Sequence, residues 1–579
     1  MTLPPLANLF AVADSDPGVL DRLEERLVAD GGFERVWRPA PGWIAASAPL
    51  PDSDPEPEAV SAAGFAFTEG RDRLERGAAT GWFEPVAELC DRSPERLGEL
   101  PGDFGLVRFR PDGTALAVRS AGGRVPLYLH ARESGGVAIG TLLDYFPRLL
   151  PGPFRADPFV NASWARALTT KFIGGRTFVQ GVSVLRRGSH TQLAPGLPPR
   201  TDVHWDPRPD EPPEASPEHA RELRRLLLEY LERELDPDGR NLLFFSGGVD
   251  SSALAALIGG TLGQRMSSWS LLPSTEPGLS TELSYIDPLV ERYDIEPSDR
   301  RRLTDEARRD WIAHAPGLPF QILHPALCDL PNVCAEQEVR TVVSGMFADE
   351  VCGERKRLHD WAVHTSLRDL VTGVPLPFGR GDYLRWARRR VERAVGRARI
   401  NIMELDEWAP PEVQDEYRDW VAAELRAIAR DPRPMPELAA RADADAWVAA
   451  YWEAASPLGA RPLVPFFTRE VLELAFRCHP RDLLGPGKKR LLRDALRDDV
   501  PERNLLRDDR GSWTGHAEAA RWPLGGGLPD AAEGLVRPDW IARPPADLEF
   551  MAGSRLTATL RVAEHLRSPE KTRNQLFAL

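Results

Sequence analysis

The sequence has no run of about 18 consecutive apolar residues, the length that a membrane-spanning helix needs. Its beginning, MTLPPLANLFAVADSD, also lacks the basic segment and the long apolar core of a secretory signal. Because both features are missing, we expect a cytoplasmic protein that does not act at a membrane.

The cysteine and histidine patterns typical of metal sites are missing as well. The 5 cysteines include no Cys-x-x-Cys pair, and the 11 histidines are scattered with no His-x-x-x-His pair. An odd number of cysteines without paired spacing disfavours both a disulfide framework and a zinc site. A net charge of −14 disfavours non-specific binding to nucleic acid. The composition therefore predicts reduced thiols, no histidine-based metal site and no nucleic-acid partner.

The chain does have the length for more than one domain, since ~100–200 residues per domain is usual and it contains 579. Leu100–Ala121 alternates apolar and polar residues around Pro111-Asp112-Gly113, which predicts a β-hairpin. Thr177–Gly196 has a strand–turn–strand pattern. We expect a first domain over 1–205 that is mainly β with some helix.

A linker is predicted where proline and acidic residues gather, in His204–His219. After it, strand-like and helix-like segments alternate, a pattern that predicts a parallel sheet covered by helices. The last ~180 residues are mostly helical by pattern. The predicted organisation is therefore a domain over 1–205, a linker over 206–218 and a second domain over 219–579.

The most informative stretch is NLLFFSGGVDSSALAALIGG, from Asn241 to Gly260. It predicts a buried strand, a turn at Gly247-Gly248 and a helix that begins near Ser251. Ligands of open α/β sheets bind at the carboxyl ends of the strands, and a glycine pair lets backbone N–H groups approach an anion. Three hydroxyl side chains in this turn can donate to phosphate oxygens: Ser246, Ser251 and Ser252.

Asp250 lies in the same turn, where a carboxylate would repel a phosphate. Its presence is explained if Mg²⁺ lies between the carboxylate and the phosphate. The stretch is not a Walker loop, because no Gly-Lys-Ser/Thr follows at the required offset. The alternative is a capped strand-to-helix turn that binds no ligand.

These residues resemble a known family. SGGVDSS resembles the pyrophosphate loop of the ATP pyrophosphatase superfamily, and Val342–Glu354 resembles the Ser-Gly-x-Gly-x-Asp-Glu segment of asparagine synthetases. Gly487–Leu496 resembles their Lys-x-x-Leu-Arg helix, and Ser456–Phe476 is similar to one of their helical segments. GDFGLVRF and GRVPLYLH resemble their N-terminal glutaminase domain. The resemblance implies an α+β, glutaminase-like (Ntn-hydrolase-type) N-terminal domain followed by an α/β ATP pyrophosphatase domain with a parallel sheet and additional helices.

The resemblance also implies the chemistry: a carboxylate is adenylated by ATP with release of pyrophosphate, and an amine then displaces AMP. The residues implied to cradle pyrophosphate are Ser246, Gly247, Gly248, Ser251 and Ser252. Those implied to line the adenosine site are Phe245, Leu271, Ser344 and Gly345. Asp250 and Asp349 would hold Mg²⁺, and Lys489 would stabilise charge that develops on the reacting oxygens. Spacing alone favours a solvated lysine on a helix at this position, and only the motif match selects Lys489 for the site.

Two departures from the family pattern concern the nucleophile. Asparagine synthetases need a cysteine exposed by removal of the first Met, and this chain has Thr2 there, so the resemblance implies a glutaminase-like fold without its nucleophile. Met346 stands where asparagine synthetases have Glu and β-lactam synthetases have Tyr, and a thioether cannot transfer a proton. A general base would lie elsewhere; the candidates by placement are Glu350, Asp382 and Tyr383.

Lasso peptide cyclases, which are macrolactam synthetases, resemble this chain in both departures. The resemblance implies that an Asp or Glu side chain of a precursor peptide is adenylated and attacked by the N-terminal amine of the same peptide. It also implies a leader-peptide-binding protein and a leader peptidase as partners. The alternatives are a β-lactam synthetase-like enzyme, an asparagine synthetase fed by free ammonia, and a scaffold that binds nucleotide without catalysis.

Overall fold

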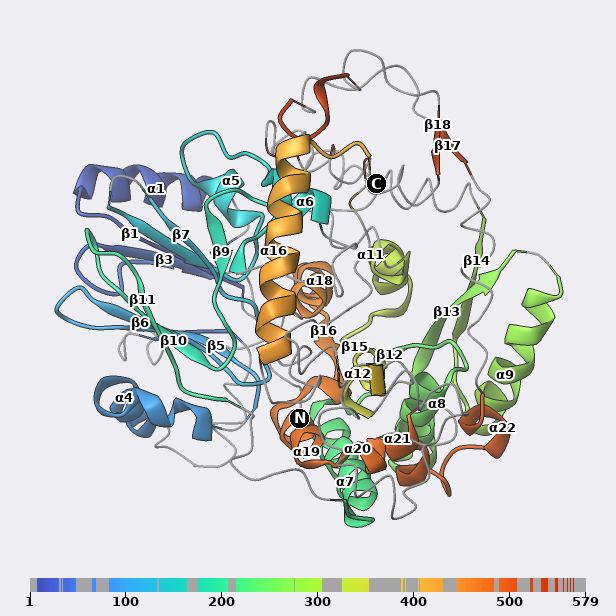
Figure 1. Ribbon diagram of the computed structural model, residues 1–579. Coiled ribbons are helices and arrows are strands. Elements are labelled where there is room, and N and C mark those ends of the chain that lie inside the picture. Colours follow the sequence, from blue (N-terminus) through green and yellow to red (C-terminus); the bar gives the residue numbers. More distant parts are fainter. Residues whose placement is uncertain are drawn as a thin grey trace.

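A computed structural model describes most of the chain (Figure 1). The described residues are 8–30, 33, 35–47, 65–68, 83–100, 102–132, 135–163, 175–206, 215–274, 276–304, 325–352, 387–388, 391, 405, 407–430, 445–483, 489–507, 521–523, 533–539, 547–549, 556, 560, 563 and 566. Part of the predicted linker 206–218 lies outside them. Thr2, Asp382 and Tyr383 lie outside them as well.

The first part of the chain forms two antiparallel sheets. The six-stranded sheet has the order β2 (Arg35–Trp37), β3 (Trp43–Ser47), β1 (Leu9–Ala13), β8 (Val137–Gly140), β7 (Tyr128–Ala131), β9 (Val182–Val184). The five-stranded sheet has the order β11 (Arg200–Val203), β10 (Ser189–Leu193), β6 (Ala115–Arg119), β5 (Gly105–Phe109), β4 (Phe65–Thr68). The predicted hairpin is β5–β6, whose turn contains Gly113 at φ +83°, a conformation that favours glycine.

Alternating side chains along these strands separate three apolar layers. Leu9, Ala11 and Ala13 of β1 pack with residues of β5 and β6 between the two sheets. Phe10 and Val12 point the other way, onto α1 (Pro17–Asp30), α5 (Tyr145–Leu149) and α6 (Pro158–Ser163). The far face of the second sheet packs on α4 (Phe83–Arg92) and η1 (Pro94–Glu99). Period-2 alternation thus produces a helix–sheet–sheet–helix stack.

The strand–turn–strand pattern of 177–196 crosses between the two sheets. β9 pairs with β7 in one sheet, and β10 pairs with β6 in the other. The residues between them carry the chain from one sheet to the other, so β9 and β10 do not form a hairpin with each other.

The second part is built on a five-stranded sheet, all of whose pairings are parallel, as the alternating pattern predicted. Its order is β14 (Ser298–Leu303), β13 (Ser267–Pro273), β12 (Asn241–Phe244), β15 (Thr341–Val343), β16 (Arg461–Leu463). The central strands β12 and β15 are buried along their whole length, in keeping with the apolar residues that follow Asn241 in β12 and Thr341 in β15.

Helices connect the strands of this sheet. Their bounds are α7 (Glu218–Glu234), α8 (Val249–Ala255), η3 (Ala256–Thr261), α9 (Gly278–Arg292), α11 (Pro325–Gln337), α12 (Ala348–Cys352), α16 (Pro411–Arg430), α18 (Asp445–Ala455), η6 (Ser456–Leu458), η7 (Pro465–Phe467), α19 (Arg469–Arg477), α20 (Pro480–Leu483), α21 (Arg490–Ala495) and α22 (Glu502–Leu505). Figure 1 shows α8, α9, α21 and α22 near β12 and β13 at lower right, whereas α16 lies beside α6 of the first part. A short antiparallel pair, β17 (Arg521–Pro523) and β18 (Asp547–Glu549), follows. None of the helices in the described ranges is long and apolar enough to span a bilayer.

The stretch 456–476 is not one helical segment, contrary to the expectation from the resemblance. Gly459 at φ +71° ends η6, and Arg461–Leu463 then becomes the edge strand β16. Pro462 cannot donate to a sheet ladder, which restricts it to an edge strand such as this one. The helix resumes at α19, where the side chain of Thr468 accepts a hydrogen bond from Val471 N at 3.3 Å.

The two parts of the chain share one apolar core, which contains Phe10 of β1 and Leu242 of β12. Polar contacts join them as well: Arg124 donates to Tyr230 Oη at 3.0 Å, and Leu143 N donates to Glu453 Oε1 at 2.7 Å. Burial raises the pKa of Glu453 to about 8 despite that hydrogen bond. The first part is therefore packed tightly against the sheet that follows.

Candidate active site

The turn after β12 has the backbone that its glycines predict. Gly247 has φ +65°, and a Cβ there would lie 3.0 Å from Tyr285 Cβ, so a side chain is excluded by both conformation and space. Ser246 Oγ and Ser251 Oγ lie 3.2 Å apart, and Ser246 N donates to Ser251 Oγ at 3.2 Å. α8 begins at Val249, two residues before the predicted start, with Gly248 as its N-cap. The turn is thus braced by hydrogen bonds between its own serines beside a helix start.

A second loop, 344–349, follows β15 and lies against this turn. The two loops meet because β12 and β15 are neighbouring parallel strands, whose carboxyl ends share one edge of the sheet. A Cβ on Gly345 would lie 2.9 Å from Asp250 Cβ and 3.3 Å from Ser251 N. Glycine at this position therefore lets the two loops touch.

Lys489 joins the two acidic residues. Its ammonium group is ion-paired with Asp250 and lies 2.9 Å from Asp349 Oδ1. Lys489 is only 8% exposed and has φ +58°, as the N-cap of α21 rather than a residue within it. It is thus a buried bridge between the two loops, and not the solvated helix lysine that its spacing also allowed.

The electrostatics of this group favour a charged lysine. Burial alone would lower the pKa of Lys489, but the carboxylates of Asp250 and Asp349 outweigh it and hold the pKa above its usual range. The ammonium stays protonated throughout the physiological range. It offsets the repulsion between two carboxylates that would otherwise face one another.

Four residues predicted to line an adenosine site lie around the same strand ends. Phe245 is buried after β12, with its N–H donating to Trp269 O at 2.8 Å, and Leu271 lies on the adjacent β13. Ser344 Oγ and Tyr451 Oη are hydrogen-bonded at 2.9 Å, which ties the loop after β15 to α18. Gly345 follows Ser344 and lies between it and the turn after β12.

The described residues do not show where the side chains of the candidate general bases lie. Met346 is partly buried and packs against the two large apolar cores, in keeping with a structural role. The side chain of Glu350 lies outside the described residues, as do Asp382 and Tyr383.

Sequence reasoning missed the residues beneath the serine turn. Asn504 Nδ2 donates to Gly247 O at 3.1 Å and to Tyr285 O at 3.0 Å, and lies 3.5 Å from the buried hydroxyl of Ser252. Arg507 donates to Ser246 O at 3.2 Å and is ion-paired with Glu282 of α9 at 2.6 Å. Their signal in the sequence is the stretch VPERNLLRDDRGSW, which resembles a Leu-Pro…Arg…Gly-Phe stretch of asparagine synthetases but predicts no contact with the serine turn.

Replacing Asn504 with alanine is expected to destabilise the turn. The carbonyls of Gly247 and Tyr285 would lose their buried donor, which costs about 1–3 kcal/mol of unfolding free energy for each unsatisfied group. Denaturant unfolding measures the loss, and ATP binding should weaken in parallel. Asn504→Asp, which keeps the shape but turns an acceptor toward the two carbonyls, should be destabilised at least as much as the alanine variant; wild-type stability in both would contradict the role.

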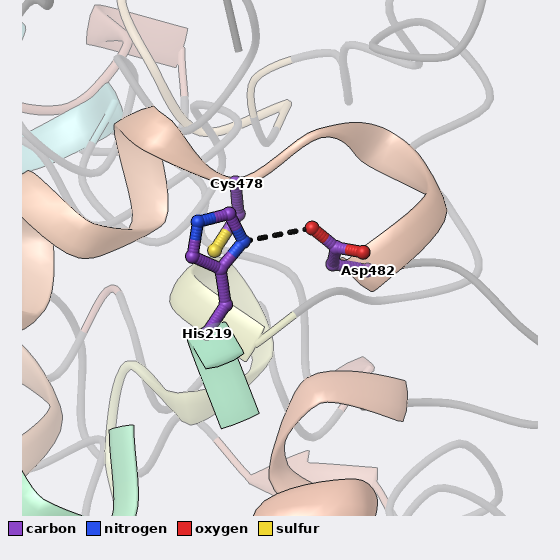
Figure 2. A group of neighbouring side chains, drawn as sticks. All are labelled: His219, Cys478 and Asp482. Carbon is purple, nitrogen blue, oxygen red and sulfur yellow. Dashed lines mark hydrogen bonds and ion pairs between the residues drawn. The ribbon is translucent and has the colours of Figure 1, made fainter. Parts of the chain in front are cut away.

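A separate group of potential metal ligands lies where α7 begins (Figure 2). His219, Cys478 and Asp482 offer ligand atoms within 4.8 Å of one another. His219 Nδ1 and Asp482 Oδ2 are already hydrogen-bonded at 2.8 Å, and Ser216 N donates to the same carboxylate oxygen at 3.1 Å. Burial raises the pKa of the Cys478 thiol, which disfavours the thiolate that a metal requires. Interactions within the chain account for this group without an ion.

The residues at the carboxyl ends of β12 and β15 have the chemistry to bind a magnesium nucleotide. Carboxylates and hydroxyls are the oxygen ligands that Mg²⁺ prefers, and Asp250 and Asp349 supply two carboxylates at one edge of the sheet. These two residues would hold the ion, whose charge would offset that of the phosphates. The glycine turn beside them would offer backbone N–H groups and serine hydroxyls to the phosphate oxygens.

Nucleotide-driven activation of a carboxyl group is the chemistry that such a site serves, and the class of protein is an ATP-dependent amide-forming ligase. More than half of the chain, residues 222–578, matches the asparagine synthase family, and the chain belongs to that family. Among curated protein sequences, none matches it.

Three solved structures are similar to parts of this chain at low sequence identity. NMN synthetase from Francisella tularensis is similar over 24% of this chain and 58% of its own, with 15% identity and a TM-score of 0.18. The U34-tRNA thiolase NcsA from Methanococcus maripaludis is similar over 37% and 77%, with 15% identity and a TM-score of 0.18. Glutamine phosphoribosylpyrophosphate amidotransferase from B. subtilis is similar over 58% and 81%, with 9% identity and a TM-score of 0.21. At these TM-scores the likenesses carry no structural conclusion.

Proposed function

We propose that this chain is a macrolactam synthetase that closes a ring in a ribosomal precursor peptide, as lasso peptide cyclases do. The observation that carries the adenylation half of this proposal is the buried Lys489 between Asp250 and Asp349, beside an open glycine turn. The observation that carries the choice of nucleophile is the pair of departures in the sequence. Thr2 replaces the cysteine that would release ammonia from glutamine, and Met346 replaces the Glu or Tyr of the small-molecule enzymes.

In the proposed first step, a carboxylate oxygen of an Asp or Glu side chain of the peptide attacks the α-phosphorus of ATP, and pyrophosphate leaves. Ser246, Ser251 and the backbone N–H groups of the turn bind the pyrophosphate oxygens. Asp250 and Asp349 would hold Mg²⁺, and the ammonium of Lys489 would stabilise the charge that develops on the phosphate. A fixed cation in a partly buried site stabilises such charge more than water does.

In the proposed second step, the N-terminal amine of the same peptide attacks the acyl carbon, AMP leaves, and the amine loses a proton. Because both reacting groups belong to one bound peptide, orientation can contribute ~7–11 kcal/mol to the lowering of the barrier. The product is an isopeptide ring. A leader-peptide-binding protein and a leader peptidase are proposed as partners, because the amine must be exposed before it can attack.

The nucleotide products and the peptide mass test this proposal directly. The full-length protein is incubated with ATP, Mg²⁺ and a leaderless precursor peptide in one arm, and with the precursor that still carries its leader plus both partner proteins in a second arm. Each arm is expected to form AMP and pyrophosphate together with a core peptide lighter by one water. Chromatography of nucleotides and mass spectrometry of the peptide measure both. The control is a precursor with an acetylated N-terminus, which should be adenylated without forming a ring.

Other outcomes point to other functions. ADP and phosphate as products would exclude adenylation. Asparagine formed from aspartate and ammonium would identify an ammonia-dependent asparagine synthetase. A ring closed only in a small β-amino acid would identify a β-lactam synthetase-like enzyme. Nucleotide binding without turnover of any of these substrates would leave a non-catalytic scaffold.

A further inference from the structure

The loop that carries Asp349 contains a backbone conformation that its sequence does not favour. Phe347 has φ +69°, in the left-handed region that a residue with a bulky side chain rarely adopts. Such a conformation persists only where the surroundings impose it. What packs on Phe347 therefore decides where Asp349, two residues further on, presents its carboxylate.

The surroundings of Phe347 lead into the N-terminal part of the chain. The Phe347 ring stacks on the ring of Phe467 at a centroid distance of 4.1 Å and an interplanar angle of 25°. The guanidinium carbon of Arg187 lies 4.2 Å from the centroid of the Phe467 ring. All three side chains are buried, with exposed fractions of 7% for Phe347, 3% for Phe467 and 1% for Arg187. A cation on a ring in such a desolvated place is a favourable and directional contact.

Arg187 itself is held by residues of the N-terminal part that lie just after strands β6 and β11. A Cβ on Gly123, whose φ is +65°, would lie 2.6 Å from Arg187 Cβ, so the chain at 123 packs directly against the arginine. The guanidinium also lies 5.9 Å from the Trp205 ring. The arginine therefore has little freedom to move away from Phe467.

We propose that Arg187 is a positioning residue for the adenylation site: through Phe467 it keeps Phe347 left-handed and so holds Asp349 beside Lys489 and Asp250. The N-terminal domain thereby sets the geometry of the magnesium site in the other domain, a task that needs no glutaminase nucleophile. This inference rests on the proposed role of Asp349 in binding magnesium ATP.

The test measures magnesium-dependent ATP binding, which needs no peptide. Equilibrium dialysis of full-length protein with ATP is carried out over a series of Mg²⁺ concentrations. In Arg187→Met, the Mg²⁺ concentration for half-maximal ATP binding is expected to rise roughly tenfold, as when a residue that orients a metal ligand is lost. Arg187→Lys, which keeps a cation near the ring, should recover part of this loss.

Arg124→Met is the matched control. Arg124 is a second buried arginine of the N-terminal part, 3% exposed, but it contacts Tyr230, Glu234 and the carbonyl of Pro462. Its loss is expected to lower the melting temperature as much as Arg187→Met does, while the Mg²⁺ dependence of ATP binding stays at the wild-type value. The double variant Arg187→Met/Phe467→Leu should shift that dependence no further than either single change. Where Arg187→Met does not fold, Phe467→Leu alone gives the measurement.

The possible outcomes distinguish the positioning role of Arg187 from the proposed function of the protein. If the wild type binds ATP and the Arg187 and Phe467 variants keep its Mg²⁺ dependence, the positioning role is overturned and the proposed function stands. If the wild type binds no ATP at any Mg²⁺ concentration, the proposed function fails, and the inference fails with it.

Discussion

Replacing Lys489 with methionine is expected to reduce pyrophosphate release by roughly 10²–10³-fold, the usual loss when one fixed group that stabilises developing charge is removed. Methionine has a similar length and no charge, so it should fill the space between the two loops. The measurement is pyrophosphate release in the presence of ATP, Mg²⁺ and the precursor peptide. The neighbouring change Arg490→Met is the control, since that side chain is 46% exposed and should leave the rate unchanged.

The same variant has a second expected result that depends on structure rather than turnover. Without the ammonium of Lys489, the carboxylates of Asp250 and Asp349 lose their shared cation. The ligand-free variant should therefore melt at a lower temperature than the wild type. Because the ammonium of Lys489 no longer competes for the carboxylates, Mg²⁺ should raise the melting temperature of the variant more than it raises that of the wild type. Equal responses to Mg²⁺ would show that the two acids do not form the ion site.

The strand and turn of this site could be predicted because their signals are local. An apolar run followed by Ser-Gly-Gly specifies a buried strand and a turn within eight residues, 241–248, and the structure has both. The hairpin β5–β6 and the helix α7 are local in the same sense. The stretch 456–476 shows the limit, because β16 exists only through its pairing with β15, which is more than a hundred residues away.

The rest of the site depends on which strands become neighbours. Nothing near Lys489 in the sequence indicates that it will be buried, and only the motif match selected it. Asn504 and Arg507 act on Gly247 and Ser246 from more than 250 positions away, through contacts that packing alone creates. The contact between Arg187 and the loop that carries Asp349 is indirect, since it runs through the rings of Phe467 and Phe347. Periodicity and spacing carry no information on such contacts.

Replacing Gly345 with alanine is expected to lower pyrophosphate release by about 10²-fold, the cost of a misplacement of roughly 1 Å at a reacting centre. The added Cβ would lie 2.9 Å from Asp250 Cβ and 3.3 Å from Ser251 N. Neither atom is the end of a flexible side chain, so the two loops must move apart, and Asp349 must separate from Asp250. The effect should appear in turnover and in the Mg²⁺ dependence of ATP binding, with little change in the far-UV circular dichroism spectrum.

Gly18→Ala provides the comparison for this change. A Cβ on Gly18, in α1, would meet Asp16 Oδ1 at 3.3 Å and Arg22 Nη1 at 3.5 Å, both of them ends of side chains that can turn aside. That variant should keep wild-type pyrophosphate release. Wild-type release in Gly345→Ala would mean that the acidic loop need not touch the serine turn during the reaction. The shared edge of β12 and β15 would then not be where the carboxyl group is activated.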